Sequence, residues 1–312
     1  MCRELLTAFE KQLNPADPTA GSFGVDIIGY GEVSAVLALA DLPDHVLKRT
    51  SGFPSREAAQ AYTEVVERYI SILRDQGIPV VSTDLVEVEP SPGRHVVYLI
   101  QPRLEAQRLG HAILKHGTTS QLNRLVECVL EYVRHVLLQN RYRTDGRLVA
   151  IDAQLSNWYW PDEPGHEHGP VLIDVGTPFM RLNGRLEIGE DVFLYSYPAP
   201  LRWWLHRQHA VERYVSDYFH FGRTVIDFIG NFSKEGAPDK IPAAVAFVND
   251  WIQRQPDKED LGEIEEATVR AYYAKDAATL ELSLRARRLA RLIATRLLRR
   301  SYDFILPGHI ER

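Results

Sequence analysis

Hydrophobic residues in the first hundred positions fall into short, strand-like runs that are interrupted once by a helical period. Between Ser55 and Gly77 the apolar residues recur every three or four positions, which predicts one long helix. The expected order is a short helix within residues 1–20, a strand, Gly-x-Gly turn and strand over 23–39, a strand at 45–49, the long helix, and strands at 85–88 and 95–100. This order predicts a sheet with one helix packed on it.

The polarity changes at residues 101–104, and beyond them the pattern becomes largely helical. Apolar residues keep a helical period over 120–140, and residues 203–231 are rich in aromatic side chains at similar spacing. Two short β-type runs interrupt the helices and end at Asp152 and Asp174, with turn residues between them. The two halves therefore predict an α+β protein with a sheet-rich first part and a helical second part.

Composition narrows the class of protein without pointing to a partner. The chain has 312 residues, 45% of them hydrophobic, and a net charge of −6, which suits an ordinary globular protein and gives no reason to expect nucleic acid. The two cysteines, Cys2 and Cys128, exclude a disulfide scaffold and a cysteine-based zinc site and favour a reducing, cytoplasmic location. We expect no membrane span, because no apolar run approaches the required length, and no secretory signal at the N-terminus.

The candidate chemistry centres on Asp152, Asn157 and Asp174. A first carboxylate can accept a hydroxyl proton, while an amide and a second carboxylate can hold Mg²⁺ against a nucleotide triphosphate. In this chain Asn157 follows Asp152 by five positions and precedes Asp174 by seventeen, and Asp174 opens an Asp-Val-Gly turn. We therefore expect Asp152 as the base and Asn157 and Asp174 as metal ligands.

Asp152-x-x-x-x-Asn157 followed by Asp174-Val-Gly resembles the catalytic loop and metal-binding turn of the protein-kinase-like superfamily. The resemblance is nearer to small-molecule kinases of the aminoglycoside phosphotransferase and choline kinase type than to protein kinases. The other family features occur upstream in the expected order. They are the glycine-rich loop with Gly29 and Gly31, the strand lysine Lys48, the helix glutamate Glu64 and an adenine-contacting hinge that includes Gln101 and Leu104.

The resemblance implies a bilobal fold. Its small lobe, residues 1–100, contains a five-stranded antiparallel sheet and one long helix; a hinge spans 101–106; and a larger, mostly helical lobe spans 107–312. It also implies ATP and Mg²⁺ as cofactors and a hydroxyl of a small molecule as the phosphoryl acceptor. Lys48 then holds the nucleotide phosphates. Glu64 and Glu67 both lie within range of this lysine, and we expect Glu64 to pair with it because Glu64 lies beside the apolar stripe, where a partly buried carboxylate needs a cation.

Several positions depart from the family pattern. Ala150 and Ile151 stand where kinases usually carry His or Tyr and often Arg, and Gln154 stands where a Lys or His is common. The alternative is therefore a pseudokinase, a nucleotide-binding or scaffolding module without phosphotransfer. Transfer of AMP instead of phosphate is a third possibility within the superfamily.

Three further groups of residues leave alternatives open. The aromatic segment 203–231, with Asp217 and Asp227, either forms helical core or shapes an acceptor pocket. His166 and His168 lie in a turn that we expect to be a solvated loop and not a metal site. The arginines between 285 and 300 decorate one helix, and we expect them to pair with the acidic stretch 257–266.

Overall fold

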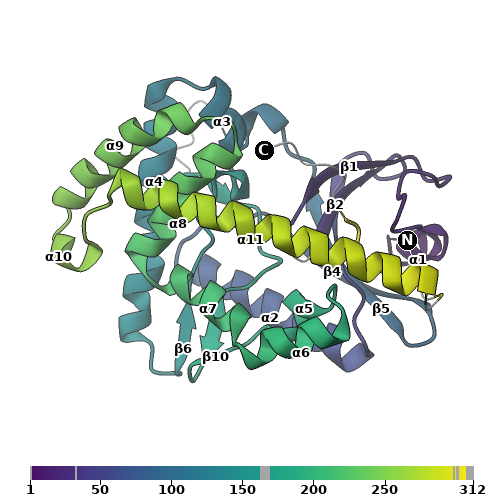
Figure 1. Ribbon diagram of the computed structural model, residues 1–312. Coiled ribbons are helices and arrows are strands. Elements are labelled where there is room, and N and C mark those ends of the chain that lie inside the picture. Colours follow the sequence, from purple (N-terminus) through teal and green to yellow (C-terminus); the bar gives the residue numbers. More distant parts are fainter. Residues whose placement is uncertain (1, 32–33, 162–168, 298, 300–301, 307–312) are drawn as a thin grey trace.

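The computed structural model describes residues 2–31, 34–161, 169–297, 299 and 302–306. Figure 1 shows a sheet-rich part beside a larger helical part, with one long C-terminal helix running across both. The turn that contains His166 and His168 lies outside the described residues. No helix in the described residues combines the length and hydrophobicity needed to span a bilayer.

The first lobe has a five-stranded antiparallel sheet in the order β1-β2-β3-β5-β4. Its elements are α1 (Cys2–Gln12), β1 (Val25–Tyr30), β2 (Ser34–Leu39), β3 (His45–Thr50), α2 (Arg56–Asp75), β4 (Asp84–Ser91) and β5 (Arg94–Pro102). Helix α2 begins where Ser55 accepts a hydrogen bond from the Ala58 N–H, and the chain leaves it at Gly77, whose φ of +76° suits a residue without Cβ.

The two faces of this sheet pack against different partners, because alternate residues of a strand point to opposite faces. Val96, Tyr98 and Ile100 of β5 lie in a core that includes Leu6 and Phe9 of α1. Val97 and Leu99 lie in the main core with α2 and the helical lobe. The sheet is thus covered on both faces, and Lys48 in β3 sits between Val36 and Leu99 on the neighbouring strands.

The second lobe is mainly helical and contains three short strand pairs or ladders. Its elements are η1 (Ala106–Arg108), α3 (Gly110–His116), α4 (Thr119–Gln139), η2 (Asn140–Tyr142), β6 (Arg147–Val149), η3 (Leu155–Asn157), β7 (Trp158–Tyr159), β8 (Val171–Leu172), β9 (Met180–Leu182), β10 (Arg185–Leu186), α5 (Asp191–Leu194), α6 (Ala199–Arg207), α7 (Ala210–Ser216), η4 (Asp217–Phe219), α8 (Phe221–Lys234), η5 (Pro238–Lys240), α9 (Ile241–Gln253), α10 (Lys258–Leu261), α11 (Glu266–Leu292) and the π-helical turn η6 (Ile293–Leu297). The short sheets pair β6 with β9, β9 with β10, and β7 with β8. This α+β, two-lobed arrangement confirms the fold expected from the sequence.

After α11 the chain returns to the first lobe. From the sequence alone, all of residues 107–312 are instead expected in the large lobe. Ile305 packs in the core with α1 and the outer face of the sheet. The backbone carbonyl of Asp303 accepts a hydrogen bond from Arg49 Nη1 at 2.7 Å, and its carboxylate accepts one from Arg94 Nε at 3.1 Å. Residues 303–306 therefore belong with the small lobe by their contacts.

A buried ionic network fastens this region. Glu10 of α1 accepts hydrogen bonds from Arg49, from Arg94 Nη2 at 3.0 Å and from the Tyr98 hydroxyl at 2.5 Å, and its side chain is fully buried. Burial raises the pKa of Glu10, but the charges of Arg49 and Arg94 and the hydrogen bonds from Arg49 and Tyr98 outweigh it, so the pKa lies below its ordinary value.

Within the described residues, Asp257 and Asp260 of the acidic stretch pair with arginines other than the expected C-terminal ones. Asp257 pairs with Arg134 of α4 at 2.7 Å, and Asp260 pairs with Arg141 at 2.8 Å. Arg285 instead pairs within its own helix with Glu281. The acidic stretch is satisfied by nearer arginines, because α9 and α10 pack beside α4 and away from the last turns of α11.

Replacing Glu10 by Gln should destabilise the protein in a pH-dependent way. The folded-state pKa of Glu10 is lowered, so its stabilisation is present above the unfolded pKa near 4.5 and is lost as the pH falls through the folded value. We expect Glu10→Gln to cost about 3–5 kcal/mol near neutral pH, because Arg49 loses its buried counter-ion.

The measurement is thermal unfolding of both proteins at several pH values, with the exposed Glu67→Gln as the control. The difference in Tm between wild type and Glu10→Gln should shrink as the pH falls below about 4.5. A difference that stays constant across the acid range would contradict an ionised Glu10 as its source.

Candidate functional site

The lobes meet where Lys48 of β3 reaches the turn after β8. Lys48 Nζ donates a hydrogen bond to the Ile173 carbonyl at 2.7 Å and contacts Asp174 Oδ1 at 3.2 Å. Lys48 is 8% exposed, so its charge is largely removed from water and the carboxylate compensates it. This contact brings together two of the residues singled out in the sequence, 126 positions apart.

The loop that carries Asp152 is held by side chains other than those typical of kinases. Ala150 and Ile151 are buried, and the Tyr69 hydroxyl of α2 donates to the Ala150 carbonyl at 2.8 Å. Trp158 Nε1 donates to the Ala153 carbonyl at 3.2 Å. Apolar residues fit at 150 and 151 because Tyr69 of α2 and Trp158 of β7 donate the hydrogen bonds that hold the loop backbone.

Asp152 lies half-buried at the end of this loop. Its Oδ1 accepts the Gln154 N–H at 3.0 Å, and Asn157 Nδ2 lies 3.5 Å from its backbone carbonyl. Burial raises the pKa of Asp152 to about 6 and the charge of Asp174 adds to this, whereas the Gln154 N–H and the charge of Lys234 oppose it. The carboxylate is therefore mostly ionised at neutral pH and still basic enough to accept a proton.

Asn157 and Asp174 line the same cavity as Asp152 and are linked through the backbone. Asp174 Oδ1 accepts the Gly176 N–H at 3.3 Å in addition to Lys48, and about one third of its side chain is exposed. The backbone carbonyl of Asn157 accepts the Ile173 N–H at 2.9 Å, which fixes the two residues relative to each other. In the described residues no group of three or more His, Cys, Asp or Glu could enclose a metal. One amide and one carboxylate oxygen fit Mg²⁺, which keeps several waters and binds substrate phosphates, better than a fully enclosed metal.

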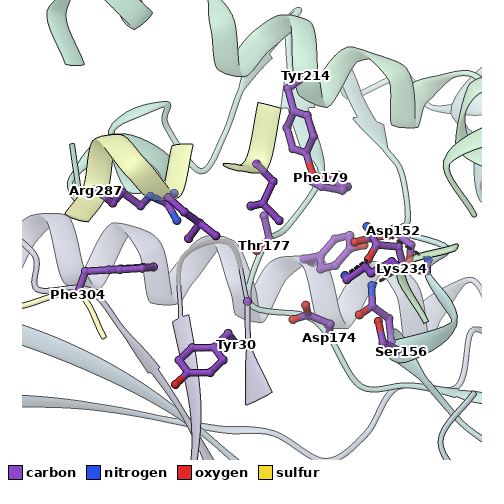
Figure 2. A pocket seen from close by; sticks show the side chains of 16 residues that line it. Tyr30, Asp152, Ser156, Asp174, Thr177, Phe179, Tyr214, Lys234, Arg287 and Phe304 are labelled. Carbon is purple, nitrogen blue, oxygen red and sulfur yellow. Dashed lines mark hydrogen bonds between the residues drawn. The ribbon is translucent and has the colours of Figure 1, made fainter. Parts of the chain in front are cut away.

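A lysine that the sequence alone does not single out, Lys234, places a second positive charge at the site. Lys234, the last residue of α8, donates to the Gln154 side-chain oxygen at 3.1 Å, and Figure 2 shows it next to Asp152. Gln154 occupies the position at which related kinases carry a cation, so α8 supplies a positive charge that the loop itself lacks. No local sequence signal marks Lys234, because 80 residues separate it from Gln154.

Glu64 is not part of this cluster. Its side chain is exposed on α2, and Lys48 pairs with Asp174 instead. The buried face of α2 carries Tyr62 and Tyr69, and the Tyr62 hydroxyl donates to the Gly176 carbonyl at 2.8 Å. The expected Lys48–Glu64 pair is therefore not formed, because Glu64 lies off the apolar stripe that faces the sheet.

The remaining predicted residues line one cavity under the sheet. Gly31 N–H donates to the Ser34 carbonyl at 2.8 Å between β1 and β2. Gln101 Nε2 donates to the Ile173 carbonyl at 3.0 Å, and Leu104 lines the same cavity with Gly29. The Gln101 side chain thus contacts the residue before Asp174. The expectation that Gln101 belongs to an adenine-contacting hinge does not include this contact.

Two cavities meet at the site. One, of about 250 Å³, contains Lys48, Gln101 and Leu104. The other, of about 200 Å³, contains Asp152 and Lys234 and is shown in Figure 2. The residues common to both are Tyr30, Gly31, Ser156, Asn157 and Asp174. The amide and carboxylate expected to bind metal thus stand at the junction of the two cavities.

Asp227 is buried behind the second cavity, whereas Asp217 is not part of it. Asn231 Nδ2 donates to Asp227 Oδ1 at 3.1 Å, and Gln154 also hydrogen-bonds to Asp227. Burial raises the pKa of Asp227 to about 8, and the charges of Asp152 and Asp276 add to the shift. Asp217 pairs with Arg223 at 2.6 Å. Segment 203–231 thus contributes Tyr214 to the wall of the second cavity, packs residues of its second half such as Phe228 in the core, and leaves Trp203 and Trp204 exposed.

Replacing Tyr69 by Phe should destabilise the loop that carries Asp152. The substitution leaves the buried Ala150 carbonyl without its donor, at an expected cost of about 1–3 kcal/mol. Chemical denaturation measures the loss, and the exposed Tyr142→Phe, expected to change stability by less than about 0.5 kcal/mol, is the control. Equal stability of Tyr69→Phe and wild type would show that this hydrogen bond does not hold the loop.

The solved structures that resemble the chain include the following two. A complex of APH(2'')-IIIa with GDP and kanamycin is 11% identical, with a TM-score of 0.36, over 81% of this chain and 99% of that chain. WaaP in complex with acyl carrier protein is 14% identical, with a TM-score of 0.31, over 78% of this chain and 90% of that chain. These superpositions are loose, and the kinase-like fold is assigned from the topology and site described above.

Among functionally curated proteins, none matches this sequence. A family model matches residues 10–292, which include every residue of the site except those contributed by the C-terminal segment 302–306. The chain belongs to DUF6206, a family of unknown function.

Proposed function

We propose that this protein is an ATP- and Mg²⁺-dependent phosphotransferase that acts on a hydroxyl of a small molecule. The observation that carries the proposal is the pair of cavities joined at Asn157 and Asp174. Lys48 belongs to one cavity only and Asp152 to the other only. Such a division suits a nucleotide on one side, an acceptor on the other, and the transferred phosphoryl group between them.

In this proposal the nucleotide base occupies the cavity beside Gln101 and Leu104, and Lys48 contacts the phosphates as a point charge. Asn157 and Asp174 would hold Mg²⁺, which would supply charge neutralisation for the phosphates. The acceptor oxygen forms a bond to the γ-phosphorus as the bond between that phosphorus and the β–γ bridging oxygen breaks. The acceptor proton passes to Asp152, and the nucleoside diphosphate leaves with the electron pair of the broken bond.

Lys234 supports the transfer step by its position. Its ammonium lies beside Gln154 and lowers the pKa of Asp152, which keeps that carboxylate ionised. The same charge faces the cavity in which negative charge develops on the phosphoryl oxygens. We propose that Lys234 replaces the cation that the kinase loop usually carries at the position of Gln154.

A small acceptor fits the second cavity better than a protein substrate. Its volume is about 200 Å³, and side chains of α11 and Phe304 enclose it on the side away from Asp152. Apolar walls with a few convergent polar groups are typical of small-molecule sites. The enclosed side leaves room for a compact hydroxylated compound and not for an extended peptide.

Substitutions at Asp152 and Asp174 should separate binding from transfer. Asp174→Ala should abolish Mg²⁺-dependent nucleotide binding, because one of two metal ligands is lost. Asp152→Ala should retain nucleotide affinity and lose phosphoryl transfer by about 100-fold or more, because the proton acceptor is lost. Calorimetric titration with Mg-ATP and an ATP-turnover screen against hydroxylated metabolites measure the two properties.

The outcomes of this experiment separate the proposal from its alternatives. Equal turnover by wild type and Asp152→Ala would refute the role of that residue. Binding of Mg-ATP without turnover on any hydroxylated acceptor would favour a pseudokinase. Release of pyrophosphate in place of ADP would indicate transfer of AMP.

Lys234→Met should lower kcat by about 100-fold with little change in nucleotide affinity, because the charge acts on the transferred group more than on the bound nucleotide. Lys258→Met, on the exposed surface of α10, is the matched control and should leave kcat unchanged. Steady-state kinetics with the acceptor found in the screen measure both. A rise in the Kd for Mg-ATP that accounts for the whole effect would instead make Lys234 a nucleotide-binding residue.

A further inference from the structure

Helix α11 forms one wall of the cavity that contains Asp152. The helix starts in the helical lobe and crosses to the sheet, as Figure 1 shows. Leu280, Leu284 and Arg287 from this helix line the cavity, and Phe304 from the segment beyond it does the same. In Figure 2 Arg287 and Phe304 stand at the end of the cavity opposite Asp152 and Lys234. The cavity therefore has a catalytic end and a second end built by the C-terminal elements.

Arg287 is held rigidly at this second end. Its guanidinium lies between the rings of Tyr197 and Phe304, with a distance of 4.8 Å to each ring centre. Tyr197 shares a hydrogen bond of 2.5 Å with Ser283, and the neighbouring Tyr302 hydroxyl donates to the Ser196 carbonyl at 2.6 Å. Stacking between two aromatic rings fixes the plane of the guanidinium at the cavity wall.

This arginine has no polar partner in the described part of the chain. Only 4% of the residue is exposed, and it makes neither a hydrogen bond nor an ion pair with the described residues. Its Nε is buried without an acceptor. Fully buried arginines are normally paired, because an isolated buried charge is costly. Arg49, which is similarly buried, has Glu10 as its counter-ion.

The acidic groups of the cavity do not compensate Arg287. Asp174 is engaged by Lys48, and Asp152 lies near Lys234 at the other end. Lys48 and Lys234 thus already balance the two carboxylates of the site. Arg287 is left as an additional cation whose planar donors match a carboxylate or a phosphate.

We propose that Arg287 is the anion-recognising residue of the acceptor site, so that the acceptor is a small hydroxylated compound bearing a carboxylate or phosphate group. The identification of the anion as part of the acceptor rests on the proposed function. The presence of an anion-binding site at Arg287 does not. The anionic group lies against Arg287, and the hydroxyl points along the cavity to Asp152. Arg287 is absent from the lining of the nucleotide cavity, which argues against a role in holding ATP.

The test uses the full-length protein and simple probes. Thermal shift and calorimetry at constant ionic strength compare inorganic phosphate, acetate, glycerol 3-phosphate, glycerate and neutral glycerol. Phosphate or acetate should raise Tm relative to chloride, and the matching hydroxylated anion should bind at least tenfold more tightly than glycerol. Comparison of the phosphate and carboxylate probes shows which anion the site takes.

Arg287→Met should lose this anion response by at least tenfold in affinity and keep the wild-type affinity for Mg-ATP. The matched control is Arg285→Met, an exposed arginine of the same helix that pairs with Glu281 and should retain the full response. Arg287→Lys keeps the charge without the planar fork, should retain a weakened response, and serves if Arg287→Met does not fold.

The proposal is overturned if wild type shows no anion response, or if Arg287→Met responds as wild type does. It is also overturned if Arg287→Met weakens Mg-ATP as much as the probes, since Arg287 then contacts the nucleotide. Failure of the proposed function has a different signature: no Mg-ATP binding by wild type, together with an anion response that depends on Arg287.

Discussion

The contact of Lys48 with Ile173 and Asp174 is the interaction on which the site depends. It joins the middle of the sheet to the turn after β8, and so it sets the distance between the lobes at the point where both cavities meet. The lysine is nearly buried, so removal of either charge would leave the other without compensation. The same contact thus links the two lobes and compensates the charge of the buried lysine.

The charges around this contact are balanced by protonation as well as by pairing. The charge of Asp174 acts on Asp152 and that of Asp152 acts on Asp227, and burial together with Asp152 and Asp276 raises the pKa of Asp227 to about 8. Asp227 is therefore mainly neutral at pH 7. Lys48 pairs with Asp174, Lys234 lies beside Asp152, and Gln154 connects Lys234 to the neutral acid. The site tolerates three aspartates because one of them carries a proton.

The sequence predicts the fold and much of the candidate site well, because these depend on local patterns. Strand alternation, the capped helix and the two aspartates at strand ends are all readable within a few residues, and Lys48, Asp152, Asn157 and Asp174 do converge. The predicted pairing of Glu64 with Lys48 is wrong because the distance along the chain does not define which side of a helix a residue occupies. The spacing of Tyr62, Val65 and Tyr69 defines the buried face of α2, and Glu64 does not lie on it. Lys234 and Arg287 are absent from any local pattern, since only packing of α8 and α11 brings them to the site.

The return of residues 303–306 to the sheet affects how the two lobes can move relative to each other. The lobes are connected twice, once after β5 and once through α11, and the second connection is locked by the network around Glu10. A body hinged at two separated points can swing only about the line through both. Separation of the lobes on this side would therefore have to break the contacts of Arg49 and Arg94 with Asp303 or move Glu10 together with the last residues.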